Sequence, residues 1–364
     1  MIIKKISKKI KSLIRKIFLL IYGKITISKD KNYLTNILEI TNFQNDIFRK
    51  QKYYLYSTSD CRIYTDLNEN VAVIKDNIIL EGHSYQQIKG CLEGSYSNSV
   101  FENGTPYLKK KIKGTIFNLL QGASGENYFH FLCDILPKIW LLNTKVNINE
   151  IDFFLVNKRI KWQTNILNSL GINNNKIISA KNNRHIHAEK VLSVTHPWYF
   201  SGYIQEQVSN LPSWIIYELR NNFLKKTSPK KNLKIFLDRS GSKFNHLKLI
   251  NNQDVINFLK TKGYIILKPE TLSLKDQVEI FNNANIIIGA HGAALTNIIF
   301  CEQKTNIIEI IPSSHPSKKC ERISKVLNLN YFRLVTEDTK NDTNFPFYIN
   351  IDLNILKNVI KSFE

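Results

Sequence analysis

The stretch NIIIGAHGAALTN, residues 285–297, constrains the fold of this chain more than any other stretch. Its apolar run at 286–288 lacks polar alternation, which is typical of a strand buried on both faces of a parallel sheet. The small residues at 289–292 predict a turn, and Ala293 begins a predicted helix. Ligands of such sheets bind beyond the carboxyl ends of the strands, where a helix N-terminus favours phosphate. His291 therefore either faces such a ligand or merely caps the helix and faces solvent.

The residues around this stretch alternate between apolar strands and helices. The predicted strands are 233–237, 264–267, 306–311 and 331–335, and the predicted helices are 253–262, 273–283 and 318–327. This alternation predicts a doubly wound, Rossmann-like domain over residues 232–345. A polar, proline-bearing run at 225–231 is the predicted linker before it. The terminal segment 346–364 has helical spacing, and we expect it to pack back across the domain junction.

Residues 28–226 predict a first α/β domain. We expect a hairpin around Asp76-Asn77, strands at 114–120, 151–156 and 176–180, and helices at 125–142 and 162–170. Pro137 should bend the helix that contains it, because proline removes a backbone hydrogen bond. A chain of 364 residues with 43% hydrophobic residues is long enough for two domains, each with its own core.

The first 27 residues are rich in lysine and arginine and contain no acidic residue; the first acidic residue of the chain is Asp30. Their apolar residues recur at helical spacing, but the longest uncharged apolar run is 17–22, which is too short to span a bilayer. This pattern predicts an amphipathic helix on an anionic membrane surface. The alternative is a basic helix that packs on the domain that follows it.

The composition narrows the classes of function. The net charge of +21 is compatible with nucleic acid, an anionic membrane or a phosphorylated substrate as partner. RNA-binding signatures are missing, so we expect no nucleic-acid partner. The five cysteines are scattered without a CxxC pair, which signals neither a zinc site nor a disulfide framework and fits reduced thiols in the cytosol.

Two charged residues follow or interrupt predicted strands of the second domain. Glu309 lies inside an apolar strand, where an unpaired carboxylate is costly, so it either binds ribose hydroxyls or pairs with a lysine. Arg239 follows the strand 233–237, at the same expected sheet edge as His291. Its planar guanidinium suits a diphosphate, and the alternative is a surface ion pair with Asp238.

The first domain carries a histidine and a carboxylate at helical spacing. His130 and Asp134 are four residues apart, which places them on one face of a helix. Such a pair can act as a general base, and apolar neighbours would raise the pKa of Asp134 by desolvation. The alternatives are a buried structural pair, or a metal site shared with His291. We predict no metal, because no further ligand occurs at close spacing.

These motifs together resemble those of glycosyltransferase family 61, which contains many capsular-polysaccharide biosynthesis proteins. GENYFHFLCD, LDRSGSKFNHLKLINNQDV, PETLSLKDQVEIFNNANIIIGAHGAALTNIIF and IIEIIP occur in this order. The resemblance runs from about residue 114 to 312. It implies a GT-B-like fold of two Rossmann-like domains that face a central cleft. It also implies inverting transfer of a hexosyl, pentosyl or N-acetylhexosaminyl group from a nucleotide-sugar.

The resemblance further implies roles for individual residues. The donor would contact Arg239, Ser240, Lys248, Asn251, Gly289, His291, Gly292, Ala293 and Glu309. Catalysis would fall to Asp134 or His130, with Asn127 and Tyr128 on the acceptor side. The family usually carries a second arginine before the asparagine, whereas this chain has Lys243 and Lys248 before Asn251. A lysine keeps the charge but loses the bidentate fork, so the second phosphate contact is open.

The sequence therefore predicts a bacterial glycosyltransferase that builds capsular or other surface polysaccharide. We expect it to use a nucleotide-sugar, linked to UDP, without a further cofactor, and to act on a glycan or lipid-linked glycan. We expect it in the cytoplasm, peripheral on the inner face of the membrane, with other polysaccharide-assembly enzymes as partners. The alternative is a non-catalytic, membrane-associated protein that binds glycans or polyanions through a degenerate pocket.

Overall fold

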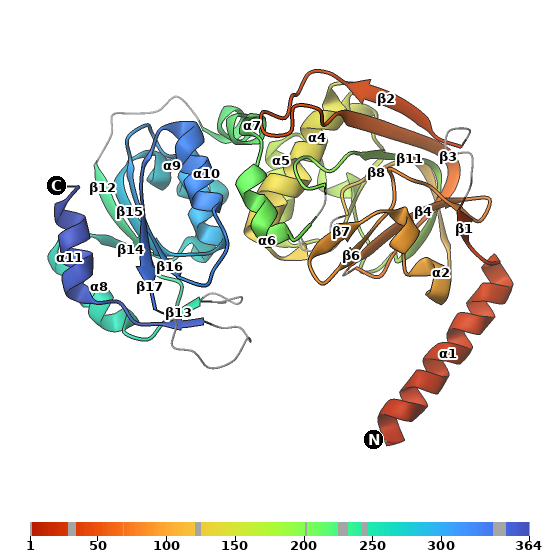
Figure 1. Cartoon of the computed structure of the whole chain (residues 1–364). Coiled ribbons are helices and arrows are strands. Elements are labelled where there is room, and N and C mark those ends of the chain that lie inside the picture. Colours follow the sequence, from red (N-terminus) through yellow and green to blue (C-terminus); the bar gives the residue numbers. More distant parts are fainter. Residues whose placement is uncertain are drawn as a thin grey trace. The chain divides into compact units, whose positions relative to one another are not determined.

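A computed structural model of the chain forms two compact units, Met1–Gln207 and Val208–Glu364 (Figure 1). It describes residues 2–27, 34–67, 69–120, 125–200, 202–224, 232–241, 247–337 and 347–363. The predicted linker at 225–231 lies outside these residues. Each unit contains its own sheet, as expected for a mixed α/β chain.

The first unit is built on a mixed sheet of eleven strands. These are β1 (Thr26–Ile27), β2 (Asn36–Ile40), β3 (Tyr53–Thr65), β4 (Asn70–Lys75), β5 (Ile78–Ile79), β6 (Tyr85–Ile88), β7 (Cys91–Glu93), β8 (Lys110–Asn118), β9 (Phe153–Val156), β10 (Ile177–Ser179) and β11 (His185–Val194). The main order is β1-β5-β4-β3-β11-β8-β9-β10, while β2 pairs with β3, β6 with β4 and β7 with β6. The hairpin between β4 and β5 turns at Asp76 and Asn77, both with positive φ, as the sequence predicts.

Only part of this sheet follows the predicted Rossmann-like pattern. The strands β11, β8, β9 and β10 are parallel neighbours, whereas β3 runs antiparallel to β11 and to β4. The expectation of a fully Rossmann-like first domain is therefore wrong for its amino-terminal part. Short connections such as Asp76-Asn77 can join only antiparallel strands, because a parallel crossover needs a dozen or more residues.

The helices of the first unit are α1 (Ile2–Tyr22), α2 (Val100–Asn103), α3 (Tyr128–His130), α4 (Leu136–Asn143), α5 (Lys161–Ser169) and α6 (Ile204–Gln207). Short 3-10 turns are η1 (Ser95–Ser97), η4 (Ile148–Glu150) and η5 (Asn174–Lys176). The turn η3 (Phe131–Ile135) is a π-helix that connects α3 to α4. In the described part of the chain, no helix is both long and apolar enough to cross a membrane.

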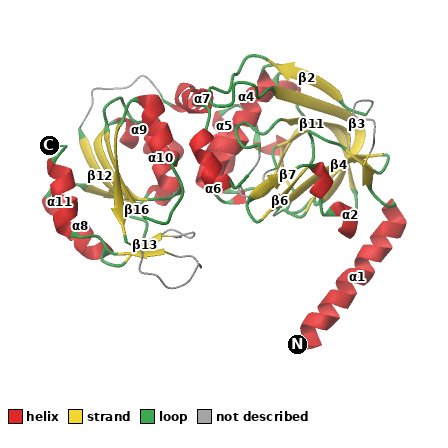
Figure 2. Ribbon diagram, viewed as in Figure 1, coloured by secondary structure: helices red, strands yellow, loops and turns green. Residues whose placement is uncertain are grey.

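The second unit contains a five-stranded parallel sheet in the order β14-β12-β15-β16-β17. Its strands are β12 (Leu233–Leu237), β14 (Ile265–Leu267), β15 (Ala284–Ala290), β16 (Asn306–Pro312) and β17 (Asn330–Thr336), and a separate pair joins β13 (Leu247–Leu249) to β18 (Phe347–Ile349). The helices are α7 (Ser213–Phe223), α8 (Asn252–Thr261), α9 (Leu274–Asn282), α10 (Lys319–Leu327) and α11 (Leu353–Lys361), with 3-10 turns η6 (Val208–Asn210), η7 (Pro269–Thr271) and η8 (Ala293–Phe300). The predicted doubly wound arrangement is visible in Figure 2, where α8 and α11 cover one face of the sheet and α9 and α10 the other.

Two helices of the second unit bear on the expected domain plan. Leu356, Val359 and Ile360 of α11 are buried in the same core as the strands of their own unit, and α11 covers the same sheet face as α8. The predicted packing of this segment across the domain junction stays a prediction. The helix α7 belongs to the second unit, although the predicted first domain extends to residue 226. Arg220 on this helix donates hydrogen bonds to the carbonyls of Ile299 and Cys301 of the same unit.

Candidate functional site

The path of the chain across the second sheet reverses between β12 and β15. From β12 the chain moves outward to β14 and then returns to β15 on the other side. Ligands of open α/β sheets bind beyond the carboxyl ends of the strands at such a reversal. Arg239 follows the end of β12, and His291 follows the end of β15. The structure thus brings these two predicted residues to one edge of the sheet.

The Arg239 side chain packs against the turn that follows β15. Its Nη1 donates a hydrogen bond to the carbonyl of His291. A Cβ atom at Gly292, whose φ is +156°, would collide with the guanidinium group. Glycine suits this position, because L side chains rarely adopt this φ and a side chain here would displace the Arg239 guanidinium.

The predicted turn at 289–292 is shorter than expected, because β15 continues to Ala290. Gly289 is a buried strand residue in register with Leu237, and a Cβ atom there would lie 3.1 Å from the Leu237 Cβ. Close packing between strands thus explains Gly289. Ala293 opens η8, which is a 3-10 helix rather than an α-helix.

His291 and Glu309 form a hydrogen-bonded pair at this edge. His291 Nδ1 lies 2.5 Å from Glu309 Oε1, and the Tyr331 hydroxyl donates to Oε2 over 2.6 Å. Glu309 is fully buried. Burial alone would raise its pKa, but the bonds from His291 and Tyr331 lower the pKa to about 2. Both carboxylate oxygens of Glu309 thus accept hydrogen bonds from the protein. The predicted contact between Glu309 and the ribose stays a prediction.

Two basic residues beside this pair were missed by the sequence reasoning. Lys319, only 4% exposed, donates from Nζ to the Gly292 carbonyl over 2.7 Å and lies 3.4 Å from the Thr296 hydroxyl. The His315 ring lies 4.3 Å from the His291 ring, centroid to centroid. The loop 313–318 has no periodic pattern, so only the start of the predicted helix near residue 318 pointed to this region.

The remaining residues predicted to contact the donor are Ser240, Asn251 and Lys248. Ser240 donates its backbone N–H and its hydroxyl to the Asp238 carboxylate, which also accepts from the Asn252 amide over 3.1 Å. The Asn251 amide exchanges hydrogen bonds of 2.8 and 3.0 Å with the backbone of Ile351, so it fastens the start of α8 to the segment before α11.

Lys248 lies on β13 in the separate two-stranded sheet. Its side chain is exposed, and its Nζ lies over the Tyr348 ring, 5.9 Å from the centroid. The second phosphate contact expected from a lysine before Asn251 therefore stays a prediction.

His291, Glu309 and Cys320 have the residue types of metal ligands, with ligand atoms within 4.8 Å of one another. They fit a metal ion poorly, because the direct hydrogen bond between His291 and Glu309 occupies the space between their ligand atoms. Burial also raises the pKa of the Cys320 thiol well above its usual value, whereas a metal ligand must be a thiolate.

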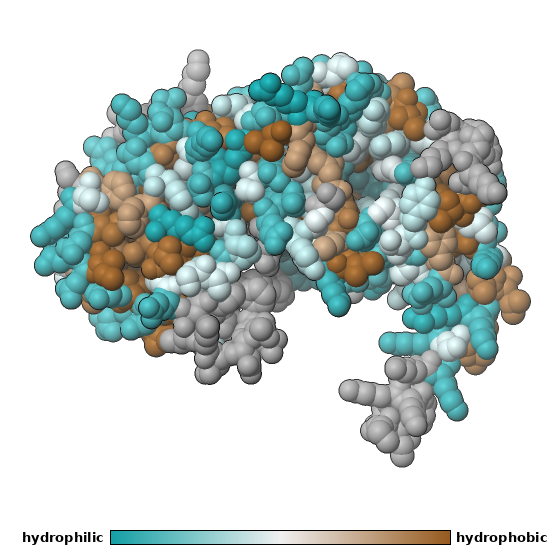
Figure 3. All heavy atoms as spheres, in the orientation of Figure 1, coloured by the Kyte–Doolittle hydropathy of each residue, from teal (hydrophilic) through white to brown (hydrophobic). Residues whose placement is uncertain are grey.

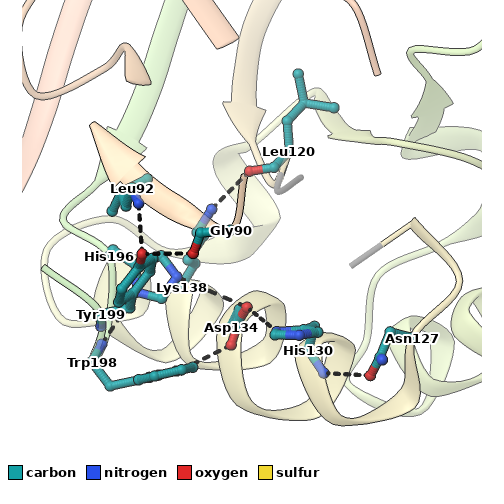
Figure 4. Close-up of polar contacts among 10 residues, drawn as sticks. All are labelled: Gly90, Leu92, Leu120, Asn127, His130, Asp134, Lys138, His196, Trp198 and Tyr199. Atoms are coloured by element: carbon teal, nitrogen blue, oxygen red, sulfur yellow. Dashed lines mark hydrogen bonds and ion pairs between the residues drawn. The ribbon is translucent and has the colours of Figure 1, made fainter. Parts of the chain in front are cut away.

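The first unit has a corresponding edge where β8 and β11 lie side by side. From β8 the chain continues through β9 and β10, and it then returns to place β11 on the other side of β8. The helix α3 follows β8, while His196 and Trp198 follow β11. The two strands are parallel, so their carboxyl ends meet at one edge. Figure 4 shows the side chains gathered there.

The predicted helix at 125–142 is interrupted where the candidate residues lie. The Asn127 side chain caps α3 by accepting from the backbone N–H of His130 over 3.3 Å. The π-turn η3 then precedes Pro137, which stands in the first turn of α4. Proline has no N–H for the usual helical hydrogen bond, which accounts for an irregular ladder just before it.

Asp134 is fully buried and receives two side-chain donors. Its Oδ2 lies 2.8 Å from His130 Nδ1, and its Oδ1 accepts from the Trp198 indole over 2.8 Å. Burial alone would raise its pKa, but the attraction and hydrogen bond of His130 hold the pKa below its usual value. The predicted rise in the pKa of Asp134 is therefore wrong. The predicted contact between His130 and Asp134 is confirmed.

His196 and Lys138 complete this cluster and were missed by the sequence reasoning. His196 Nδ1 accepts from the backbone N–H of Tyr199 over 2.9 Å, which leaves the hydrogen on Nε2, 3.9 Å from Asp134 Oδ2. Lys138, 5% exposed, donates to the Leu120 carbonyl over 2.9 Å. Burial lowers the pKa of His196 to about 3 and that of Lys138 to about 8. The available signal was His196-Pro197-Trp198 shortly after the predominantly apolar stretch 191–194.

Both edges therefore hold a histidine whose Nδ1 faces a buried carboxylate. The His130 side chain is 12% exposed, whereas the Asp134 side chain is fully buried. A histidine held in this way has a fixed tautomer and one nitrogen left to exchange a proton. Tyr128, predicted on the acceptor side, packs against Trp162 with ring centroids 5.7 Å apart and the ring planes tilted by 49°.

Comparison with known proteins gives matches of very different extent. The model of the family "Glycosyltransferase 61" matches residues 128–308. A β-1,2-xylosyltransferase of Arabidopsis thaliana is 43% identical over 60 residues, which cover 16% of this chain and 11% of that protein. A solved flavo di-iron protein of Thermotoga maritima is 10% identical over 91% of this chain and 100% of its own, and its TM-score of 0.26 is too low to support any argument.

The family match runs from α3 in the first unit to β16 in the second. It contains His130 and Asp134 as well as Arg239 and His291, and it ends one residue before Glu309. The residues at both sheet edges thus lie within or beside the matched segment. The chain belongs to the glycosyltransferase 61 family.

Proposed function

We propose that this protein is an inverting glycosyltransferase that moves a sugar from a nucleotide-sugar to a growing capsular or other surface glycan. The observation that carries the proposal is the pair of sheet edges, each with a histidine bonded to a buried carboxylate. The edge in the second unit adds the cations Arg239 and Lys319, which suit a diphosphate. The edge in the first unit supplies a candidate base, the imidazole of His130.

We assign the base to His130 rather than to Asp134. A general base must reach the proton that it abstracts, and the Asp134 carboxylate is fully buried with both oxygens occupied. Asp134 holds His130 Nδ1, which leaves Nε2 to accept the proton of the acceptor hydroxyl. The acceptor oxygen then bonds to the anomeric carbon while the bond from that carbon to the diphosphate breaks. A single displacement of this kind inverts the anomeric centre.

The departing nucleoside diphosphate gains negative charge during this step. Arg239 and Lys319 are placed to stabilise that charge, and fixed cations in a water-poor site are effective because they need no reorganisation. We expect a UDP-linked donor and no further cofactor. Because the relative from Arabidopsis thaliana is named a xylosyltransferase, UDP-xylose is the first donor to test.

We also propose that α1 holds the protein on an anionic membrane surface. From residue 9 to 17 every side chain of α1 is exposed, including Lys9, Lys11, Arg15 and Lys16. Its exposed apolar residues are Ile10, Leu13, Ile14, Ile17, Leu19, Leu20 and Ile21. Figure 3 shows hydrophilic side chains, in teal, on the visible face of the described part of this helix, with apolar side chains, in brown, beside them. A helix of this kind binds where lipid covers its apolar side and anionic headgroups meet its lysines.

Thermal unfolding with a panel of nucleotide-sugars tests the donor proposal. A ligand at 100 times its dissociation constant should stabilise the folded protein by about 2.7 kcal/mol. Polyphosphate serves as the control for charge alone. If polyphosphate stabilises the protein and no nucleotide-sugar does, the alternative of a polyanion-binding protein replaces the enzyme.

A further inference from the structure

The hydrogen bond between His291 and Glu309 fixes which nitrogen of the histidine carries a hydrogen. The pKa of Glu309 is lowered to about 2, so its carboxylate is ionised at neutral pH and can only accept hydrogen bonds. His291 Nδ1, 2.5 Å from Oε1, must therefore be the donor. This leaves Nε2 either as a bare lone pair or as a second N–H.

In the free protein, burial favours the bare lone pair. Burial is the largest influence on the pKa of His291 and holds it below its usual value. Glu309 acts in the opposite direction, while the charges of Lys319 and Arg239 lower the pKa further. The imidazole is thus neutral at pH 7 and above, and Nε2 is an acceptor. A phosphate oxygen is also an acceptor, so the two cannot form a hydrogen bond in this state.

The charged and titratable groups around His291 come from every neighbouring element. Glu309 lies on β16 and Tyr331 on β17, while Lys319 and Cys320 lie on α10, His315 precedes α10 and Arg239 follows β12. The two cations oppose a further positive charge on His291. An arriving diphosphate would offset these cations and supply an acceptor for a second N–H.

We propose that His291 takes up one proton from solvent on Nε2 when the diphosphate of a nucleotide-sugar binds. His291 then holds the diphosphate as an imidazolium, and Glu309 is the positioning residue that keeps Nδ1 occupied. The inference rests on the proposed function, because it needs a diphosphate at this edge of the sheet. It adds that a proton is already in place beside the leaving group before the bond to the sugar breaks.

Isothermal titration calorimetry in buffers of different ionisation enthalpy measures this uptake directly. UDP-sugars are the probes, because their diphosphate diester has no group that titrates near neutral pH. With the full-length protein at pH 7.5, the slope of observed enthalpy against buffer ionisation enthalpy should correspond to about one proton bound per ligand. The affinity should fall by about tenfold for each unit of pH increase over this range.

Matched variants assign the proton. His291→Asn keeps a side-chain N–H donor but cannot take up a proton, so the slope should fall to near zero while weaker binding remains. His187→Asn is the control, because His187 Nε2 lies 2.8 Å from Asp60 in a more exposed histidine–carboxylate pair on β11. This control should leave the slope unchanged. His315→Asn should also retain the uptake, because His315 is only a neighbour of the protonated ring.

The outcomes separate this inference from the proposed function. UDP-sugar binding with no proton uptake by the parent protein overturns the inference and leaves the glycosyltransferase proposal standing. Uptake that persists in His291→Asn but disappears in His315→Asn also overturns it, by moving the proton to His315. If neither UDP- nor GDP-linked sugars bind to the parent protein, the inference and the proposed function both fail. The titrations of the parent protein alone decide the first and last outcomes, whether or not a variant folds.

Discussion

At the scale of single residues, Asp134 can act on a substrate only through His130. Its carboxylate is buried, and its two side-chain donors are His130 on α3 and Trp198 in the segment after β11. Such a carboxylate orients the imidazole and stabilises it once the proton has been transferred. The arrangement differs from the direct carboxylate base that the sequence also allowed.

We expect Asp134→Asn to lower turnover by roughly two to four orders of magnitude, because it disables the positioned base His130. The amide would leave His130 with a poorer partner, and His130→Ala should lose at least as much activity. Donor affinity should change little in both variants, because the proposed diphosphate site lies in the other unit. Steady-state kinetics measure both effects. Asp60→Asn, which alters the pair with His187, is the control, and a folded Asp134→Asn protein with parental turnover would contradict the assignment.

Lys138 makes the stability of the protein depend on pH. Burial lowers its pKa from 10.5 to about 8, so the unfolded chain binds a proton between these values that the folded chain does not. The free energy of unfolding should therefore rise with pH across this window, by roughly 3 kcal/mol at most. Urea unfolding measures the free energy of unfolding of the parent and of Lys138→Met. The value for the parent, relative to that of the variant, should increase from pH 8 to 10.5. Parallel curves for the two proteins would show that burial does not lower the pKa of Lys138 in the folded protein.

At the scale of elements, α11 completes the core of the second unit. We expect Leu356→Ala to destabilise the protein by about 2–5 kcal/mol, because this fully buried side chain would leave a cavity. Ile355→Ala is the matched control, since the preceding side chain is 51% exposed and should cost far less. Urea unfolding monitored by circular dichroism measures both. Equal effects of the two substitutions would mean that α11 does not pack as described.

The regular elements of the second unit were predictable because each buried strand is a short apolar run followed by an amphipathic helix. Parallel strands place their carboxyl ends together, so the meeting of Arg239 with His291 could also be predicted. The contacts of Asp134 with Trp198 and of Gly292 with Lys319 could not. They join segments far apart in the sequence through strand pairing and loop conformation, and neither leaves a periodic pattern. The π-turn before Pro137 was missed because a proline marks an interruption without specifying its form.

At the scale of the whole molecule, the net charge of +21 and the exposed helix α1 act together. Removing residues 1–24 should release the protein from phosphatidylcholine–phosphatidylserine vesicles, whereas transfer to a soluble acceptor should persist. Vesicle sedimentation at low and high salt measures binding, which should weaken with salt because headgroup attraction is screened.

Single substitutions separate the apolar contribution of α1 from that of charge. Leu20→Ser should weaken vesicle binding by about tenfold or more, the effect of withdrawing one leucine side chain from an apolar environment. Leu20 is 87% exposed and Leu108, outside α1, is 79% exposed, so Leu108→Ser is the matched control and should bind like the parent. Vesicle binding that survives both the deletion and high salt would rule out α1 as the anchor.

The pairing of β3 with β11 has a consequence for the synthesis of the chain on the ribosome. One edge of β3 pairs with β11. The two strands are far apart in the sequence: His187 on β11 and Asp60 on β3, which form a hydrogen bond, are separated by 127 positions. At ordinary translation rates that edge stays open for roughly ten seconds after β3 emerges. An open strand edge is a template for pairing with other chains. A translational pause before residue 194 should therefore lower the yield of soluble protein, and a pause of equal length after it should not.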